Sequence, residues 1–192
     1  LDESNKSFVE DRLNALLNMT SDRVQAELRF ALGRDENDRP ADLEGWQKLL
    51  ASGGNAVIGR RRFFSMETQC VTCHSIGGRG GRVGPDLGMI ARSQTRREII
   101  RSIIQPSAYF GPEYQTWELE QKDGEILSGA LVGVEKDGTA ILMLPTGQTR
   151  TVSGSDVKHL RGLTSSVMPR GLEVGWSTES LRDVVAFLAT MR

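Results

Sequence analysis

Apolar residues recur every three or four positions at both ends of the chain and every second position in its middle. Residues 1 to about 66 follow the helical spacing, which predicts several helices in succession. Asn55 precedes the last of these helices and is expected to cap it. Helical spacing returns after Ser177, where Ser177 or Thr178 is the expected cap of a closing helix. The apolar stripe of that helix consists of Leu181, Val184, Val185 and Leu188.

Two other helices have sequence signals at their ends. Asp38 and Pro40 are expected to open one of them, because proline is tolerated in the first helical turn. Thr95 and Glu98 have the spacing of a capping box for the other, which an isoleucine-rich run continues. Pro106 is expected to end this helix.

Residues 113–161 alternate between apolar and polar positions in short runs, which predicts five β-strands. Tight turns separate the runs, at Lys122-Asp123-Gly124, Lys136-Asp137-Gly138 and Pro145-Thr146-Gly147. Short strands on tight turns are typical of a small antiparallel barrel, which we expect here. No predicted strand carries a catalytic constellation of residues.

Charge and composition exclude several functions. The chain has 24 Lys and Arg against 25 Asp and Glu, for a formal net charge of −1, so nothing marks a nucleic-acid binder. No run reaches the ~18 apolar residues of a membrane span, and we expect no transmembrane segment. The chain begins with Leu1 instead of methionine, so we expect a processed chain or a piece of a longer one.

The two cysteines lie three positions apart and a histidine follows at once, in the string Cys70-Val71-Thr72-Cys73-His74. Two thiols at this spacing suit addition to the two vinyl groups on one porphyrin edge, and the histidine suits axial ligation of the iron. This is the attachment pattern of haem c. The sequence therefore predicts one covalently bound haem held by Cys70, Cys73 and His74.

Three alternatives compete with this interpretation. A thioredoxin-type redox pair is expected at a helix start after a strand, whereas a helix containing Phe63 precedes this motif. A zinc site needs four ligands, and His74 directly beside Cys73 suits a tetrahedron poorly. A disulfide across a gap of two residues is strained.

Met168 is the predicted second ligand of the iron. It lies in a loop ahead of the closing helix, and Pro169 holds the preceding backbone extended, which aims the thioether. The alternatives are His159, which we interpret as a surface or barrel residue, and the other methionines, which lie near the motif, in a strand or at the terminus. His/Met ligation suits electron transfer.

The run Gly59 to Phe64, the cysteine motif, Gly84-Pro85-Asp86-Leu87 and Met168-Pro169 before a closing helix resemble class I cytochrome c. This resemblance implies that the carbonyl of Pro85 accepts a hydrogen bond from the second ring nitrogen of His74. It also implies that Leu87 packs on the haem, and Phe63 is expected to help bury the haem. Arg82 and Arg92 are candidate partners of the haem propionates.

A narrower resemblance is to the haem-binding domain found at the C-terminal end of planctomycete and verrucomicrobial proteins described as membrane-bound dehydrogenases. The matching motifs occur in order over about residues 57–190. They are Gly78-x-Gly80-Gly81-x-x-Gly84-Pro85-Asp86-Leu87, Ser102-Ile103-Ile104-Gln105-Pro106-Ser107, Tyr114, Asp123-Gly124-x-x-x-x-Gly129, Ser166-x-Met168-Pro169-x-Gly171-Leu172 and Asp183-x-x-Ala186-Phe187-Leu188.

The expected architecture is α+β. A mainly α, cytochrome c-like haem domain over residues 57–192 is expected to contain the barrel of residues 113–161 as an insertion, which explains the long separation of His74 from Met168. Residues 1–56 are expected to form an N-terminal helical extension.

The expected function is single-electron transfer, not catalysis on a substrate. The resemblance implies a dehydrogenase as electron donor and another cytochrome or an oxidase as acceptor. Because haem c is attached after export, the motif implies a periplasmic or otherwise exported protein. Two alternatives are a haem enzyme or sensor in which Met168 leaves the iron open to peroxide or small gases, and a docking module in which the haem is partly structural.

Overall fold

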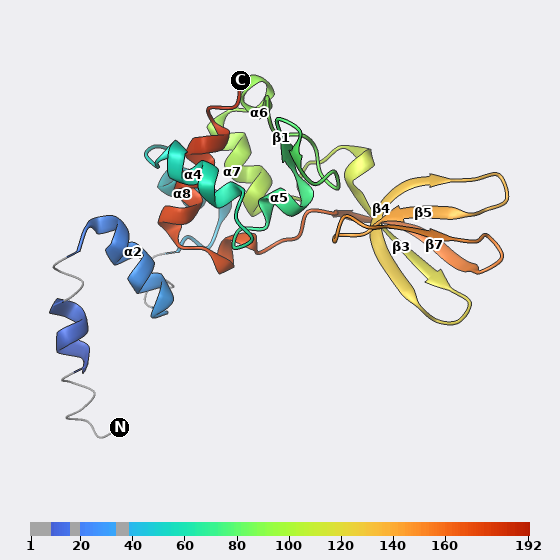
Figure 1. The fold of residues 1–192 in the computed structure, drawn as a ribbon, viewed down its shortest axis with the longest axis horizontal. Helices are drawn as coiled ribbons and strands as arrows, with labels where there is room; N and C mark the ends of the chain where they lie inside the picture. Colours follow the sequence, from blue (N-terminus) through green and yellow to red (C-terminus); the bar gives the residue numbers. More distant parts are fainter. Residues whose placement is uncertain (1–8, 16–19, 34–38) are drawn as a thin grey trace.

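The computed structural model describes residues 9–15, 20–33 and 39–192, and in this part the chain is an α+β protein. The helices gather in one region and a five-stranded antiparallel sheet projects from it (Figure 1). A two-stranded hairpin adds further β-structure beside the helices. The prediction of a mainly α cytochrome-like fold is therefore wrong, because sheet makes up a large share of the described chain. No helix among the described residues is long and apolar enough to cross a membrane.

Local signals place most helix ends where the sequence predicts them. Asn55 caps α4 and accepts hydrogen bonds from the N–H groups of Val57 and Ile58. Thr95 and Glu98 form the predicted capping box of α7, and Ser177 caps α8. The helices are α2 (Asp22–Ala31), α3 (Leu43–Leu49), α4 (Ala56–Phe63), α5 (Cys70–Cys73), α6 (Ile90–Ser93), α7 (Arg96–Ile104) and α8 (Thr178–Leu188). Two 3-10 helices are η2 (Pro112–Tyr114) and η3 (Leu172–Gly175).

The third predicted helix begins later than expected. Its cap is Asp42, whose carboxylate accepts a hydrogen bond from the N–H of Gly45 at 2.8 Å, and α3 starts at Leu43. Pro40 therefore precedes the helix, and Asp38 lies outside the described residues. The first predicted helix is described over residues 9–15 only.

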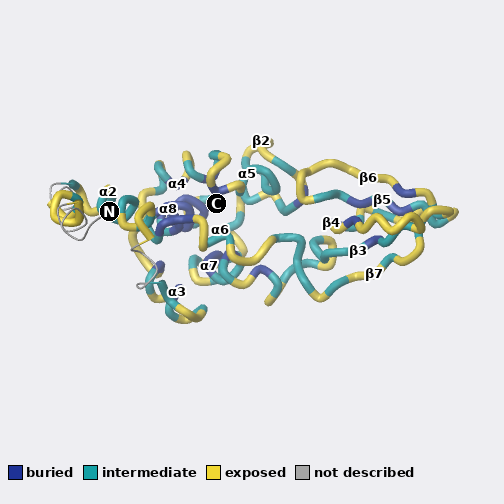
Figure 2. The backbone as a smooth tube through the Cα atoms, turned by 90° about the horizontal axis from the view of Figure 1, so that it is seen from below, coloured by how far each residue is buried: buried dark blue, intermediate teal, exposed yellow. Residues whose placement is uncertain are grey.

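The helical core forms where α4 crosses α8. At the crossing, a Cβ atom on Gly59 would lie 1.9 Å from the carbonyl oxygen of Asp183, so only glycine allows this approach. Phe63 has no exposed surface and packs against Phe187, with ring centroids 5.8 Å apart. Figure 2 shows the densest burial on α8. The buried cluster comprises Trp46, Leu50, Phe63, Ile99, Ile100, Ile103, Trp176, Leu181, Val184, Val185, Phe187 and Leu188.

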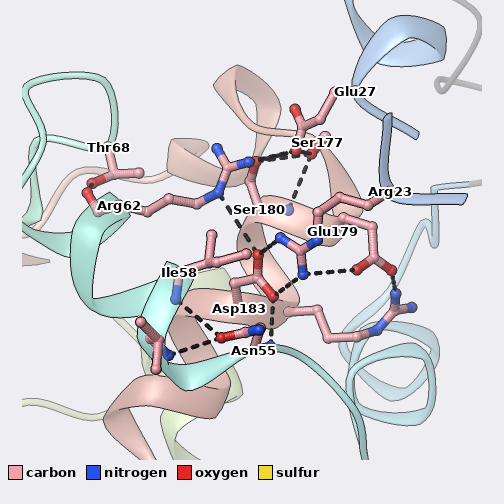
Figure 3. Close-up of polar contacts among 12 residues, drawn as sticks. Arg23, Glu27, Asn55, Ile58, Arg62, Thr68, Ser177, Glu179, Ser180 and Asp183 are labelled. Carbon is pink, nitrogen blue, oxygen red and sulfur yellow. Dashed lines mark hydrogen bonds and ion pairs between the residues drawn. The ribbon is translucent and has the colours of Figure 1, made fainter. Parts of the chain in front are cut away.

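Residues 39–56 and α2, which belong to the predicted N-terminal helical extension of residues 1–56, pack on this core. Asp183 of α8, which is fully buried, accepts hydrogen bonds from Arg23 of α2 and from the backbone N–H of Asn55 (Figure 3). Glu27 of α2 contacts Arg62 of α4 at 2.6 Å. These contacts attach α2 to both helices of the crossing.

The sheet has the strand order β6-β5-β4-β3-β7, with every pair antiparallel. Its strands are β3 (Gln115–Gln121), β4 (Ile126–Val134), β5 (Ala140–Met143), β6 (Thr149–Val152) and β7 (Val157–Ser166). The first part of β4, up to Ala130, pairs with β3 and runs towards the helices. The second part, from Ala130 to Val134, pairs with β5 and runs away from the helices. A register shift between Leu131 and Gly133 and a close approach of Gly129 to the Met143 carbonyl mark this change of direction.

This bend folds the sheet on itself and gives it a core of its own. Leu119 and Leu142, on opposite halves, have no exposed surface, and Leu127, Ala140 and Val152 complete the buried cluster. The predicted barrel is nevertheless wrong, because β6 and β7 are not paired and the sheet stays open. The predicted strand number and turns are confirmed, but β7 continues to Ser166, beyond the predicted segment 113–161.

Candidate haem-attachment site

The cysteine motif forms a single helical turn, α5, beside the helical core (Figure 1). Gln69 precedes it with φ of 56°, a left-handed conformation that turns the chain sharply into the helix. The N–H of His74 donates to the carbonyl of Cys70 at 2.9 Å, after which the backbone at His74 is extended. One turn of helix therefore places both thiols on one side of the chain and the imidazole directly after them.

The ring of His74 is oriented by the backbone of Pro85. Its Nδ1 lies 2.9 Å from the Pro85 carbonyl oxygen. Because a carbonyl can only accept, Nδ1 carries the proton and Nε2 presents a free lone pair. Burial lowers the pKa of His74, although the bond to Pro85 opposes this shift. A neutral, oriented imidazole is the form that binds iron.

Backbone hydrogen bonds fold the following glycine-rich loop against α5. The N–H of Gly81 donates to Val71 at 2.8 Å, and the N–H of Gly84 donates to Cys73 at 2.9 Å. A Cβ atom on Gly84 would lie 2.5 Å from Cε1 of His74, and one on Gly81 would lie 1.9 Å from the carbonyl oxygen of Thr72. Glycine is therefore required at both positions for the loop to enclose the imidazole.

Within this loop, β1 (Ser75–Ile76) and β2 (Arg79–Gly80) form a hairpin. Gly77 and Gly78 occupy its turn, both with positive φ. This hairpin was not predicted from the sequence, although a Gly-Gly pair between two short runs is a known hairpin signal.

Asp86 stabilises the same loop through two hydrogen bonds. Its carboxylate accepts hydrogen bonds from the hydroxyl of Ser75 at 2.6 Å and from the N–H of Gly88 at 2.7 Å. These two donors, the hydroxyl above all, lower the pKa of Asp86. Asp86, which follows Pro85, is therefore bonded to Ser75, which follows His74.

The two half-buried thiols lack the lowered pKa of reactive cysteines. Both cysteines are free, which removes the disulfide alternative for this structure. Burial raises the pKa of Cys70 to about 11 and also raises the pKa of Cys73. A thioredoxin-type pair depends on a lowered cysteine pKa, so this environment disfavours that alternative.

The zinc alternative lacks a fourth ligand at the loop. Among the described residues, no group of three or more His, Cys, Asp and Glu side chains is arranged to hold a metal ion. His159 is exposed on β7, where it pairs in register with Glu120. The loop carries two thiols and one imidazole, the set that haem c uses, beside the Asp86 carboxylate that bonds Ser75 and Gly88.

Apolar side chains around the loop suit a large apolar ring. Leu87 is half-buried and packs against the helical core, whereas Phe63 lies inside it. The half-buried apolar residues packed on this core from segments flanking the loop are Cys70, Val71, Ile76, Leu87, Ile90, Ile104, Met168 and Leu172. Together with the donor set, this partly exposed apolar surface fits haem c.

Met168 lies in the segment that joins β7 to η3 and returns from the sheet to the helices (Figure 1). Its side chain is half-buried and packs against the same core as Cys70 and Leu87. The backbone N–H groups of Ser166, Val167 and Met168 each donate a hydrogen bond. Their acceptors are the Ser107 hydroxyl, the Tyr114 carbonyl and the Ser166 hydroxyl. The sequence predicted Met168 as a ligand but missed these anchors.

Arg82 and Arg92 are both exposed, and neither makes an ion pair within the described part of the chain. Their role as propionate partners stays a prediction. Arg79 and Arg60 lie over the ring of Phe64, at 4.4 and 5.4 Å from its centroid, and add further positive charge beside the loop.

One contact between the sheet and the loop was not expected from the sequence. Sγ of Cys73 lies 3.9 Å from the carbonyl oxygen of Pro145, in the turn between β5 and β6. This turn therefore approaches the second cysteine of the motif.

A scan against protein-family models found no match, and no curated protein matches the sequence. The resemblance to haem-binding domains therefore depends on the sequence motifs alone.

Proposed function

We propose that this chain carries one covalently attached haem c and transfers single electrons between proteins outside the cytoplasm. The arrangement of Cys70, Cys73 and His74 supports this most directly, because the bond from His74 to Pro85 leaves Nε2 free as a ligand. The cysteine thiols and the half-buried apolar residues around them supply the remaining requirements for binding a porphyrin.

Each residue has a distinct part in this proposal. Cys70 and Cys73 each add their S–H across one vinyl group, forming a carbon–sulfur bond while the thiol hydrogen moves to the neighbouring carbon. His74 would hold the iron through Nε2, and Pro85 keeps its ring in place. Met168 would hold the iron through its thioether, and Leu87 would cover apolar surface of the haem.

When bound, haem c supplies one iron that alternates between the ferric and ferrous states. With His74 and Met168 both holding the iron, electron transfer would be favoured over peroxide or gas chemistry. The partners we propose are redox proteins, namely a dehydrogenase donor and a cytochrome or oxidase acceptor.

The attachment is tested by producing the chain in a periplasm that contains haem c maturation machinery. Mass spectrometry and a pyridine haemochrome spectrum should show one haem per chain. The double variant Cys70→Ala/Cys73→Ala should carry none. An unmodified mass for the wild-type chain under these conditions would overturn the proposal.

The second ligand is tested by Met168→Leu, with Met66→Leu as its control because Met66 is exposed. The oxidised wild type and Met66→Leu should show the charge-transfer band of methionine-ligated ferric haem at the red end of the spectrum. Met168→Leu should lose it. A high-spin wild-type spectrum without this band would favour the enzyme or sensor alternative instead.

A further inference from the structure

Three consecutive backbone N–H groups fix the chain immediately before and at Met168. The N–H of Ser166 donates to the hydroxyl of Ser107 at 3.1 Å, and the N–H of Val167 donates to the carbonyl of Tyr114 at 2.8 Å. The N–H of Met168 then donates to the hydroxyl of Ser166 at 3.2 Å. The backbone of this methionine is therefore held by two serine side chains and one carbonyl.

Two of these acceptors, from Ser107 and Tyr114, lie on the segment that enters the sheet, whereas Ser166 and Met168 lie on the segment that leaves it. Ser107 follows the buried Pro106 just after α7, a helix of the core. Tyr114 ends η2 at the start of β3. The pairing of Gln115 with Ser166 continues this attachment into the sheet. The segment that leads into the sheet and the segment that leaves it are thus hydrogen-bonded to each other directly before Met168.

We propose that Ser107 and Ser166 are positioning residues for the Met168 thioether, an inference that rests on the proposed function. A methionine side chain has three rotatable bonds, so its sulfur is placed reliably only if its backbone is fixed. Ser107 fixes the backbone relative to α7, and Ser166 fixes it relative to β7. The sheet thereby takes part in holding the iron ligand, in addition to any contact with partners.

This arrangement predicts how the variants behave. Ser107→Ala removes the acceptor for Ser166, and Ser166→Ala removes the acceptor for Met168. Loss of one such hydrogen bond should raise the ratio of released to bound Met168 about two- to tenfold. An added ligand that competes with Met168 for the iron should therefore bind to both variants about two- to tenfold more tightly than to the wild type.

The experiment titrates purified full-length holoprotein with imidazole and follows the red-end charge-transfer band of the ferric form. The variants are Ser107→Ala, Ser166→Ala and Ser107→Thr, which retains a hydroxyl. Ser165→Ala is the matched control, since this neighbouring serine makes no side-chain hydrogen bond within the described residues. Reduction potentials and circular dichroism are measured in parallel.

The proposal is supported if both alanine variants keep the helical circular dichroism, bind imidazole about two- to tenfold more tightly and have lower reduction potentials. Ser107→Thr and Ser165→Ala should then match the wild type. Equal imidazole affinity in all variants overturns the positioning role while the proposed function stands. A wild type with covalent haem but no charge-transfer band also overturns it, since Met168 then does not bind. A wild type without covalent haem overturns the proposed function itself.

Discussion

Arg23 and Asp183 are 160 positions apart in the sequence and form a two-pronged ion pair in the fold (Figure 3). Nη2 of Arg23 donates to Oδ1 of Asp183 at 2.7 Å, and Nη1 donates to Oδ2. The hydrogen bond to Asp183 is the main cause that raises the pKa of Arg23. The Asp183 side chain has no exposed surface, so Arg23 is its main charged partner in place of water.

Arg23→Ala should lower the free energy of unfolding by about 2–3 kcal/mol, because it leaves the buried carboxylate with the backbone N–H of Asn55 and, as a charged partner, the more distant Arg62. Arg29→Ala on the exposed side of α2 is the control and should change stability by less than about 0.5 kcal/mol. Urea unfolding of both variants checks this. Equal stability of the two variants would show that α2 does not contribute to the helical core.

Gly59→Ala should destabilise the crossing of α4 and α8. Alanine is normally about 1 kcal/mol better than glycine within a helix. Here its Cβ would overlap the Asp183 carbonyl oxygen, and the helices must separate, which costs about 3 kcal/mol. Thermal unfolding shows whether Gly59→Ala lowers or raises the stability. An increase in stability would mean that the two helices do not approach as closely as the structure has them.

Gly84→Ala should disturb the imidazole of His74, since its Cβ would contact the ring while Pro85 holds the ring on the other side. We expect about tenfold less low-spin haem per chain. Gly133→Ala is the control, because a Cβ there meets no atom within 4 Å. Haem content and the oxidised spectrum measure the difference, and equal haem loading in the two variants would contradict the role of Gly84.

The local signals were sufficient for many elements of the fold. Asn55, Thr95 and Ser177 cap their helices through neighbouring N–H groups, so a short stretch of sequence specifies each start. The strand turns are local in the same way. The cysteine motif was equally visible, because its chemistry depends on residues within one helical turn.

Contacts between distant segments were not predictable in this way. The barrel prediction failed because closure requires β6 to pair with β7, and these two strands are the unpaired edges of the sheet. The contact of Ser107 with Ser166 and that of Cys73 with Pro145 likewise depend on how the sheet meets the helices. Both serines stood in recognisable motifs, but no spacing rule joins them.

Acidification should weaken the loop around His74 through Asp86. The folded pKa of Asp86 is lowered from its ordinary value of 3.8, mainly by the hydroxyl of Ser75 and then by the N–H of Gly88. A carboxylate whose pKa is lower in the folded than in the unfolded state stabilises the fold at any pH above the unfolded-state pKa. This stabilisation is lost as the pH falls through the folded-state pKa.

Thermal midpoints of the apoprotein measured from pH 7 downward should therefore show Asp86→Asn less stable than wild type at neutral pH. The difference should shrink below about pH 3.8. Ser75→Ala should show the same trend because it removes the larger of the two contributions. A difference that stays constant over the whole range would contradict this assignment.

The bend of β4 has a further consequence for the geometry of the sheet. The turns at residues 122–124, 136–138 and 153–156 all lie at the end away from the helices, whereas the segments that meet α5 and Met168 lie at the opposite end (Figure 1). Lys136 is exposed in one of these outer turns. A fluorophore or an inserted peptide at this turn would extend outward along the strands, so the sheet offers an attachment point for reporting on the protein without altering the proposed iron ligands.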